Sequence, residues 1–172
     1  FIQGSFLILS ISAFYILRKK HLEFARRSFT IALCVASFAI VAQIITGHFS
    51  AEVVAEHQPA KLAAFEGVYK TEESTPLYLF GIPDSESEEV KYGIPIPGML
   101  SLLVHHDSKT PVTGLDQFAE EDRPPVQIPF QMYHLMISLG MYFLILIFGS
   151  LVLMWKGALF KQRWLMWVFV FS

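Results

Sequence analysis

The stretch Ser28–Phe49, SFTIALCVASFAIVAQIITGHF, contains no Asp, Glu, Lys or Arg. A helix needs about 20 apolar residues to cross the roughly 30 Å hydrocarbon core of a bilayer, so this run predicts a membrane-spanning helix. The composition agrees, with 53% hydrophobic, 15% aromatic and only 16% charged residues and a mean hydropathy of +0.48. Such a chain of 172 residues carries too much apolar surface for a water-soluble domain.

Three further apolar runs lie on either side of this stretch. The first is Phe1–Leu17, the second is Pro124–Trp155, which has one His but no Asp, Glu, Lys or Arg, and the third is Trp164–Ser172. We therefore expect an all-α, polytopic transmembrane protein with about four membrane segments. The expected segments are 1–20, 28–49, 126–156 and 164–172, with a large loop over 50–125. Because the chain does not begin with Met and its last run is too short to span, we expect an internal fragment of a longer protein.

The distribution of charge predicts an orientation for these segments. Eight of the thirteen basic residues lie in the short connections 18–27 and 156–163, and the positive-inside rule places such connections in the cytoplasm. Residues 51–125 contain fourteen of the fifteen acidic residues and five basic ones, a net charge of −9. We therefore expect the loop 50–125 on the outer face. A loop of this length is typical of a functional segment.

The loop begins with a polar stretch that has helix-forming composition over 52–69. Pro59 is expected either to separate two short helices or to start the second one at its first turn. Lys61 and Glu66 lie five residues apart, about 140° around a helix, so they cannot share a narrow face but can flank one bound ring. From composition alone, solvated charges on a helix face are the commoner interpretation. Residues 71–123 are rich in Pro and acidic residues and are expected to be mostly loop, with one short helix.

The third apolar run carries His134 and Met136, an imidazole and a thioether, which are the two commonest neutral haem ligands. Two residues apart on a helix, they point about 200° away from each other, so they cannot both bind one iron. A haem at this position would take its second ligand from elsewhere. The alternatives are that Met136 only packs and that His134 is solvated near the interface.

The remaining histidines have weaker signals. His48 and His57 flank the polar stretch and are expected to form interfacial hydrogen bonds. His105 and His106 have no Cys or carboxylate at metal-ligand spacing, so they predict at most a weak metal site.

Several of these features together resemble subunit I of the cytochrome bd-type quinol oxidases, in the form with a short quinol loop. The resemblance covers essentially the whole chain. It rests on Gly47–Gly67 with Gly81-Ile82-Pro83-Asp84, on the basic turn Leu22–Phe29, and on the third apolar run. It implies a multi-pass protein of the bacterial or archaeal plasma membrane whose outer segment is the quinol-binding loop.

The resemblance also implies roles for individual residues. Lys61 and Glu66 match the Lys and Glu associated with quinol oxidation, and His48 and Gln58 lie in the same stretch as expected quinol contacts. Met136 matches the axial ligand of the low-spin haem b, whose partner His would lie upstream of Phe1. His134 occupies a cofactor-binding position at which many members of the family carry Arg.

The function implied by this resemblance is transfer of electrons from quinol to oxygen, which forms water and generates a proton motive force. Glu66 suits the acceptance of a quinol proton if burial raises its pKa, and Lys61 suits a hydrogen bond to a quinone oxygen. A high-spin haem b and a haem d are implied in the full subunit. The implied partners are ubiquinol or menaquinol, oxygen, a second oxidase subunit and membrane lipid. The isolated fragment is not expected to be active.

Two other interpretations are compatible with the residues. The chain can belong to a non-redox receptor or transporter with an acidic ectodomain, or to a degenerate oxidase subunit that has lost activity. Nucleotide-binding, zinc-protease and serine-hydrolase motifs are absent from the sequence, and the basic residues follow membrane orientation, so nucleic-acid binding has no support.

Overall fold

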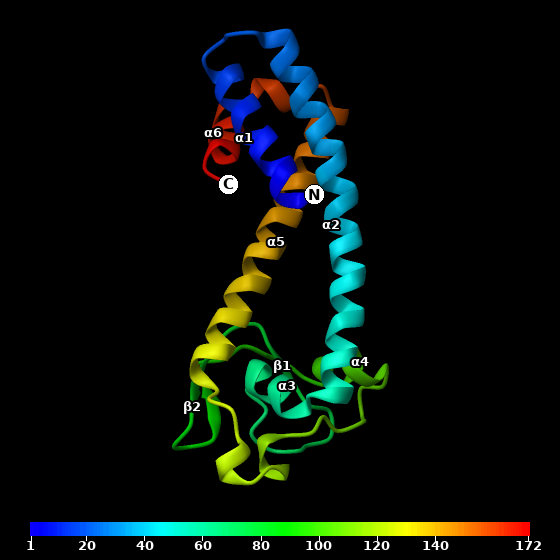
Figure 1. Ribbon diagram of the computed structural model, residues 1–172, viewed down its shortest axis with the longest axis vertical. Coiled ribbons are helices and arrows are strands. Elements are labelled where there is room, and N and C mark those ends of the chain that lie inside the picture. Colours follow the sequence, from blue (N-terminus) through cyan, green and yellow to red (C-terminus); the bar gives the residue numbers. More distant parts are fainter. The chain divides into compact units, whose positions relative to one another are not determined.

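The computed structural model describes residues 1–172, and the chain is mostly helical (Figure 1). It divides into two compact units. The first unit consists of Phe1–Thr46 and Gly140–Ser172, and the second consists of Gly47–Leu139. The six helices are α1 (Ile2–Leu17), α2 (Leu22–His57), α3 (Pro59–Glu66), α4 (Met99–His105), α5 (Gln127–Trp155) and α6 (Arg163–Val170). The four strands are β1 (Leu77–Tyr78), β2 (Ile82–Asp84), β3 (Glu89–Lys91) and β4 (Pro95–Ile96), and short 3₁₀ helices lie at 115–117, 120–122 and 159–161.

Two helices are long and apolar enough to cross a membrane, α2 with 36 residues and α5 with 29. Only 28% and 17% of their most apolar 18-residue windows are buried. Most of this apolar surface therefore faces outward, unlike the core helix of a soluble protein. The expectation of about four membrane segments is corrected to two, because α1 has 16 residues and α6 has only eight, fewer than a full crossing needs.

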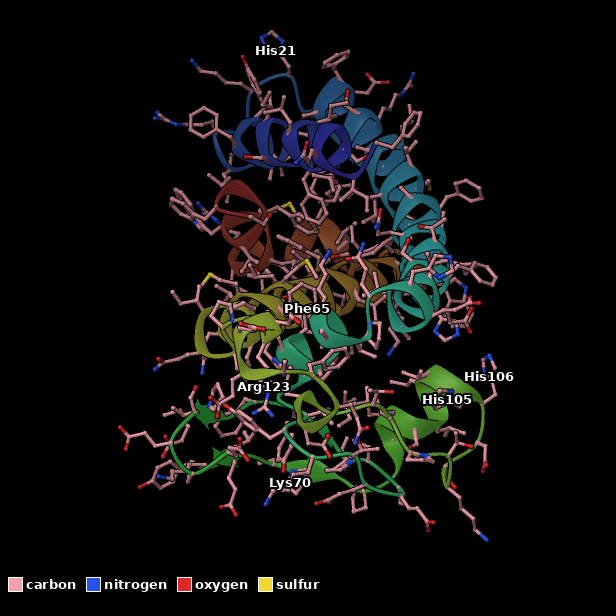
Figure 2. All side chains as sticks on the ribbon, turned by 60° about the horizontal axis from the view of Figure 1, so that its bottom comes forward. His21, Phe65, Lys70, His105, His106 and Arg123 are labelled. Atoms are coloured by element: carbon pink, nitrogen blue, oxygen red, sulfur yellow. The ribbon has the colours of Figure 1, made fainter.

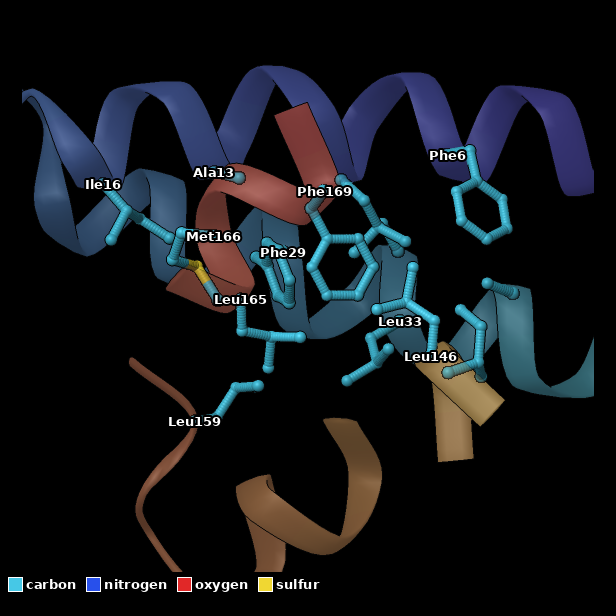
Figure 3. Packing of buried hydrophobic residues seen from close by; sticks show 14 of the residues in the cluster. Phe6, Ala13, Ile16, Phe29, Leu33, Leu146, Leu159, Leu165, Met166 and Phe169 are labelled. Atoms are coloured by element: carbon cyan, nitrogen blue, oxygen red, sulfur yellow. The ribbon is translucent and has the colours of Figure 1, made fainter. Parts of the chain in front are cut away.

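In the first unit, α1 and α6 lie side by side and share an apolar core with parts of α2 and α5 (Figure 3). Phe29 of α2 and Phe169 of α6 are fully buried and meet edge to face, with 5.0 Å between ring centroids. Edge-to-face contacts of this kind add to the free energy gained from burial. The core packs the parts of α2 and α5 that belong to the first unit against α1 and α6.

The second unit contains α3, α4, the strands, the last turns of α2 and the first turns of α5. β1 pairs with β4 and β2 pairs with β3, both antiparallel, with Tyr78 opposite Pro95 and Pro83 opposite Val90. The expectation for 71–123 was a loop with one short helix. The helix is present as α4, but the strands and the 3₁₀ helices correct the rest, and the fold is helical with two small sheets rather than strictly all-α.

Local chemistry explains where α2 and α3 meet. α2 continues to His57, eight residues beyond the expected boundary at 49, and Gln58 then leaves the helical conformation at φ −138° and ψ 56°. Gln58 precedes Pro59, and a residue before proline is disfavoured in the helical region. Pro59 is the first residue of α3, where its missing N–H costs nothing, as the sequence predicted. α3 then ends at Gly67, whose φ of 67° is left-handed.

Candidate functional site

The short helix α3 presents two charged residues to different environments. Lys61 is exposed, whereas Glu66, five residues later, is only 3% exposed. One face of α3 is buried through Leu62 and Ala63 in the apolar core of the second unit. Since Lys61 and Glu66 lie about 140° apart around the helix, burial of that face covers one charge and leaves the other in solvent.

Burial raises the pKa of the Glu66 carboxyl from 4.5 to about 7. A polar interaction with the hydroxyl of Tyr133 lowers this pKa and offsets part of the effect of burial. The carboxyl oxygen Oε2 of Glu66 has no hydrogen-bond partner. A buried carboxyl with a pKa near neutrality changes its protonation at physiological pH, which is the property a proton-transfer group needs.

Each of the two charged residues of α3 contacts an aromatic side chain. The Phe65 ring, labelled in Figure 2, stacks on the Tyr133 ring of α5, with 5.1 Å between centroids and 10° between planes. The ammonium group of Lys61 lies 5.6 Å from the centroid of the Phe65 ring. The Lys61 cation thus contacts one ring of the stacked pair, and the Glu66 carboxyl interacts with the hydroxyl of the other. Flat aromatic surfaces of this kind are suited to stacking against a planar ligand.

His134 of α5 is buried, with 7% of its surface exposed, so it is not the solvated ring that was one of the expectations. Its Nδ1 lies 2.9 Å from the carbonyl oxygen of Phe130, and its Nε2 lies 2.8 Å from the carbonyl oxygen of Tyr78 in β1. Both ring nitrogens therefore lie at hydrogen-bonding distance from backbone carbonyl oxygens. A second contact from α5 is donated by Gln131 Nε2 to the carbonyl oxygen of Gly81, at 2.7 Å.

Met136 lies on the same helix, but its side chain is 61% exposed. An exposed, neutral thioether on a helix is available as a ligand to a group bound against that face, and its donor chemistry fits a haem iron. The thioether of Met136 thus fits a haem iron, and His134, the other expected cofactor-binding residue, contacts backbone carbonyl oxygens in this structure.

A polar cleft of about 280 Å³ opens directly after α3. Its lining residues come from the segment after α3 and from β1 and β3: Gly67, Val68, Tyr69, Lys70, Glu72, Thr75, Pro76, Tyr78, Glu88, Glu89 and Val90. Neither Lys61 nor Glu66 lines it, although Gly67 is the next residue after Glu66. His134 Nε2 contacts the backbone carbonyl oxygen of Tyr78, and Tyr78 lines the cleft. This histidine therefore also holds one wall of the cleft in place.

The two other residues expected to contact quinol lie apart from this aromatic contact. Gln58 is exposed at the start of α3, where its backbone carbonyl accepts from the N–H of Lys61. His48 contacts Glu52 and His106 instead. The sequence interpretation missed Phe65 and Tyr133. Phe65 was detectable as the residue one helical turn after Lys61, whereas nothing in the sequence indicated that Tyr133 would meet α3.

Comparison with known proteins places these features in context. The model of the family described as cytochrome bd terminal oxidase subunit I matches residues 1–172. The putative cytochrome bd menaquinol oxidase subunit I of Bacillus subtilis (strain 168) is 31% identical over 174 residues, which cover 99% of this chain and 39% of the relative. The cytochrome bd-II ubiquinol oxidase subunit 1 of Escherichia coli (strain K12) is 35% identical over 128 residues, which cover 74% of this chain and 25% of the relative.

A solved structure is also similar. The bd oxidase from Geobacillus thermodenitrificans superimposes with a TM-score of 0.84 and 29% sequence identity, covering 98% of this chain and 39% of that chain. The chain thus spans about two fifths or less of the length of the relatives it matches.

Proposed function

The chain belongs to the cytochrome bd terminal oxidase subunit I family, and on that premise we propose that it forms the quinol-oxidising part of a respiratory quinol:oxygen oxidoreductase. The whole enzyme would transfer electrons from quinol to oxygen and form water. The observation that carries the proposal is Glu66, a buried carboxyl with a pKa of about 7 that lies beside stacked aromatic rings and within one short helix of an exposed Lys.

Oxidation of a quinol releases two protons with two electrons, so the site needs a proton acceptor next to the ring. Glu66 serves as that acceptor in its ionised form, because a base works best when its pKa lies near the operating pH. The phenol of Tyr133 contacts the same carboxyl and orients it. The exposed Lys61 ammonium donates a hydrogen bond to a quinol oxygen and stabilises negative charge that develops there.

The aromatic pair Phe65 and Tyr133 supplies the surface on which the quinol ring stacks. We leave His48 and Gln58 out of the proposed contacts, since His48 is engaged with Glu52 and His106 and Gln58 begins α3 with an exposed side chain. The relatives are named as menaquinol and ubiquinol oxidases, and the proposed contacts address the ring that both quinols share.

The family consists of cytochromes, which are haem proteins, and Met136 is the residue we propose as an axial ligand of a low-spin haem b. When bound, this haem would accept the electrons of the quinol one at a time. The second axial ligand and the sites of the high-spin haem b and haem d are proposed to lie in parts of the subunit outside these 172 residues.

Membership of this family also suggests where in the cell the chain lies. Bd-type oxidases work in the plasma membrane, and α2 and α5 are apolar enough to cross it. We propose that the acidic second unit faces the outer side, where Glu66 would release its proton, and that a second oxidase subunit completes the complex. Release of protons outside during quinol oxidation would contribute to a proton motive force.

A reduced-minus-oxidised optical spectrum of the full-length subunit in its membrane tests the cofactor part of this proposal. Met136→Leu is expected to abolish or shift the low-spin haem b signal, whereas Met141→Leu, a similarly exposed Met on another face of α5, is expected to retain it. If the parent protein shows no haem signal, the redox function fails and the non-redox receptor or transporter takes its place.

Quinol-dependent oxygen consumption tests the proton-transfer part. Glu66→Gln is expected to lower kcat by about 100-fold or more, the usual effect of losing a general base, with the haem spectrum unchanged. Oxidation of a one-electron donor that carries no proton should be unaffected by the same change. Glu56→Gln, which removes an exposed carboxylate at the end of α2, is the matched control. An equal loss of activity with quinol and with the one-electron donor would contradict a proton-accepting role for Glu66.

A further inference from the structure

Two histidines and one carboxylate meet where the end of α2 approaches the end of α4. The Glu52 carboxylate oxygen Oε1 lies 3.3 Å from His48 Nε2 and 2.9 Å from His106 Nε2. The ligand atoms of all three residues lie within 4.8 Å of one another. The rings of His48 and His106 are 5.9 Å apart between centroids. All three residues belong to the second unit and take no part in the α3–α5 contact.

The backbone explains why these side chains converge. His48 and Glu52 are one helical turn apart on α2, so they project from the same face. His106 follows the last residue of α4 and adopts a left-handed conformation at φ 56°, with its N–H donating to the carbonyl oxygen of Leu102. Figure 2 shows His105 and His106 at this end of α4. Glu52 and His106 are 54 residues apart, so the spacing in the sequence gave no sign of a site.

The meeting of these three side chains changes the interpretation of His105 and His106. His105 and His106 were expected to form at most a weak metal site, because no carboxylate lies at ligand spacing from them in the sequence. In the folded chain Glu52 supplies that carboxylate to His106, and His48 supplies a second imidazole. The adjacent His105 is not part of the cluster.

We propose that His48, Glu52 and His106 form a binding site for a divalent transition metal of the Zn²⁺ class. Two imidazole nitrogens and one carboxylate oxygen are a donor set that Zn²⁺ takes in proteins, with a fourth position left for water. Ligands held about 2.0 to 2.1 Å from a tetrahedral ion lie roughly 3.3 Å from one another, which is close to the two N–O distances found here. Ca²⁺ and Mg²⁺ are excluded as the favoured ions because they prefer oxygen ligands alone.

The site has a structural consequence in the second unit. A metal held by Glu52 and His106 joins the end of α2 to the end of α4 and closes the 54-residue segment that contains α3 and both sheets. Binding to the folded state alone stabilises that state by mass action, so metal should raise the unfolding temperature of the second unit. The alternative is that the cluster is only a pair of ion contacts between Glu52 and protonated histidines.

Titration of the purified full-length subunit in its complex tests the proposal. After treatment with a chelator, Zn²⁺ alone is added and binding is measured by calorimetry. Co²⁺ is added in a parallel sample, and its coordination is measured at the cobalt X-ray absorption edge, which haem does not obscure. The variants are His106→Ala and Glu52→Gln, with His105→Ala as the matched control on the neighbouring residue. The metal-free unfolding temperature and the elution volume of each variant show whether it folds.

The expected result is one Zn²⁺ site in the parent protein and in His105→Ala, with the Kd more than about tenfold higher in His106→Ala and Glu52→Gln. The edge signal of four-coordinate Co²⁺ and the metal-dependent rise in unfolding temperature should be lost in the same two variants. Equal affinity in all variants, or no Zn²⁺ binding to the folded parent protein, would overturn the proposal and leave the ion contacts as the only role of the cluster. None of these three readouts depends on quinol oxidation.

Discussion

The imidazole of His134 joins helix α5 to strand β1, since its Nε2 lies 2.8 Å from the carbonyl oxygen of Tyr78. The other ring nitrogen lies 2.9 Å from the carbonyl oxygen of Phe130, and the ring stacks on Phe130 at 3.9 Å between centroids. A carbonyl oxygen can only accept a hydrogen bond. The neutral ring, with a single N–H, therefore satisfies one of these contacts, and the imidazolium satisfies both.

His134→Leu is expected to loosen the attachment of the 71–123 segment to α5. The change removes the ring that contacts the half-buried carbonyl of Tyr78, and a carbonyl left unpaired and shielded from water costs about 1 to 3 kcal/mol. Limited proteolysis should cleave the 71–123 segment faster in this variant, and the unfolding temperature should fall. His134→Gln retains one hydrogen-bond donor, so its cleavage rate and unfolding temperature should lie between those of His134→Leu and those of the parent protein. His57→Leu, at an exposed histidine, is the control, and equal cleavage rates in His57→Leu and His134→Leu would contradict a clamping role for His134.

Glu66 should make stability fall as pH rises. Its pKa is 4.5 in the unfolded chain and about 7 in the folded one, so the folded state binds the proton more tightly. The stabilisation is complete below pH 4.5 and is lost between pH 4.5 and about 7, with a total of about 3 kcal/mol. Glu66→Gln cannot ionise, so it should match the parent protein at acidic pH and exceed its stability at pH 8.

Thermal unfolding across pH 4 to 8 measures this difference. Glu56→Gln removes an exposed carboxylate from the same unit and corrects for the general effect of losing one negative charge. Parallel pH curves for Glu66→Gln and the parent protein would show that the folded and unfolded states bind the Glu66 proton equally well. That result would remove the electrostatic basis of the proposed proton acceptor.

Tyr133→Phe should raise the pKa of Glu66 further. The hydroxyl of Tyr133 lowers that pKa by stabilising the carboxylate, while burial is kept when Phe replaces Tyr. An infrared titration of the protonated carboxyl band, assigned by its absence in Glu66→Gln, reads the midpoint directly. Tyr142→Phe is the control on the same helix, in the other unit. A midpoint that stays in place or moves to lower pH would show that Tyr133 does not stabilise the Glu66 carboxylate.

The sequence predicts the long elements well because their signals are local. Uncharged runs identify α2 and α5, and Pro59 marks the start of α3, since one chemical property decides each feature. The end of the membrane segment was placed at 49 because the uncharged run ends there, and the helix-forming stretch from 52 was expected as a separate element, whereas α2 continues through both. Local patterns thus identify helices more reliably than they place the ends of those helices.

The small sheets and the contacts of the site depend on information that local patterns do not carry. The strands have two or three residues each, too few for an alternating pattern, and Pro83 and Pro95 lie inside them. The environment of Glu66 depends on packing against Tyr133, and the cluster at Glu52 depends on His106, in both cases across more than fifty residues. The family resemblance singled out Glu66 as a candidate proton acceptor, and tertiary packing supplies its raised pKa.

Two glycines of the second unit should respond in opposite directions to replacement by Ala. Gly67 ends α3 at φ 67°, and a Cβ there would lie 2.7 Å from Val90 Cγ2 and 3.0 Å from Phe130 Cε2. Gly67→Ala therefore adds backbone strain of roughly 1 kcal/mol to a steric clash with the core, and the unfolding temperature should fall. Gly47 lies within α2 with nothing within 4 Å of the added atom, so Gly47→Ala should stabilise by up to about 1 kcal/mol. Because Gly67 directly follows Glu66, Gly67→Ala should also lower quinol oxidation, while Gly47→Ala should leave it unchanged. Equal unfolding temperatures for the two variants would contradict the tight packing of Gly67 against Val90 and Phe130.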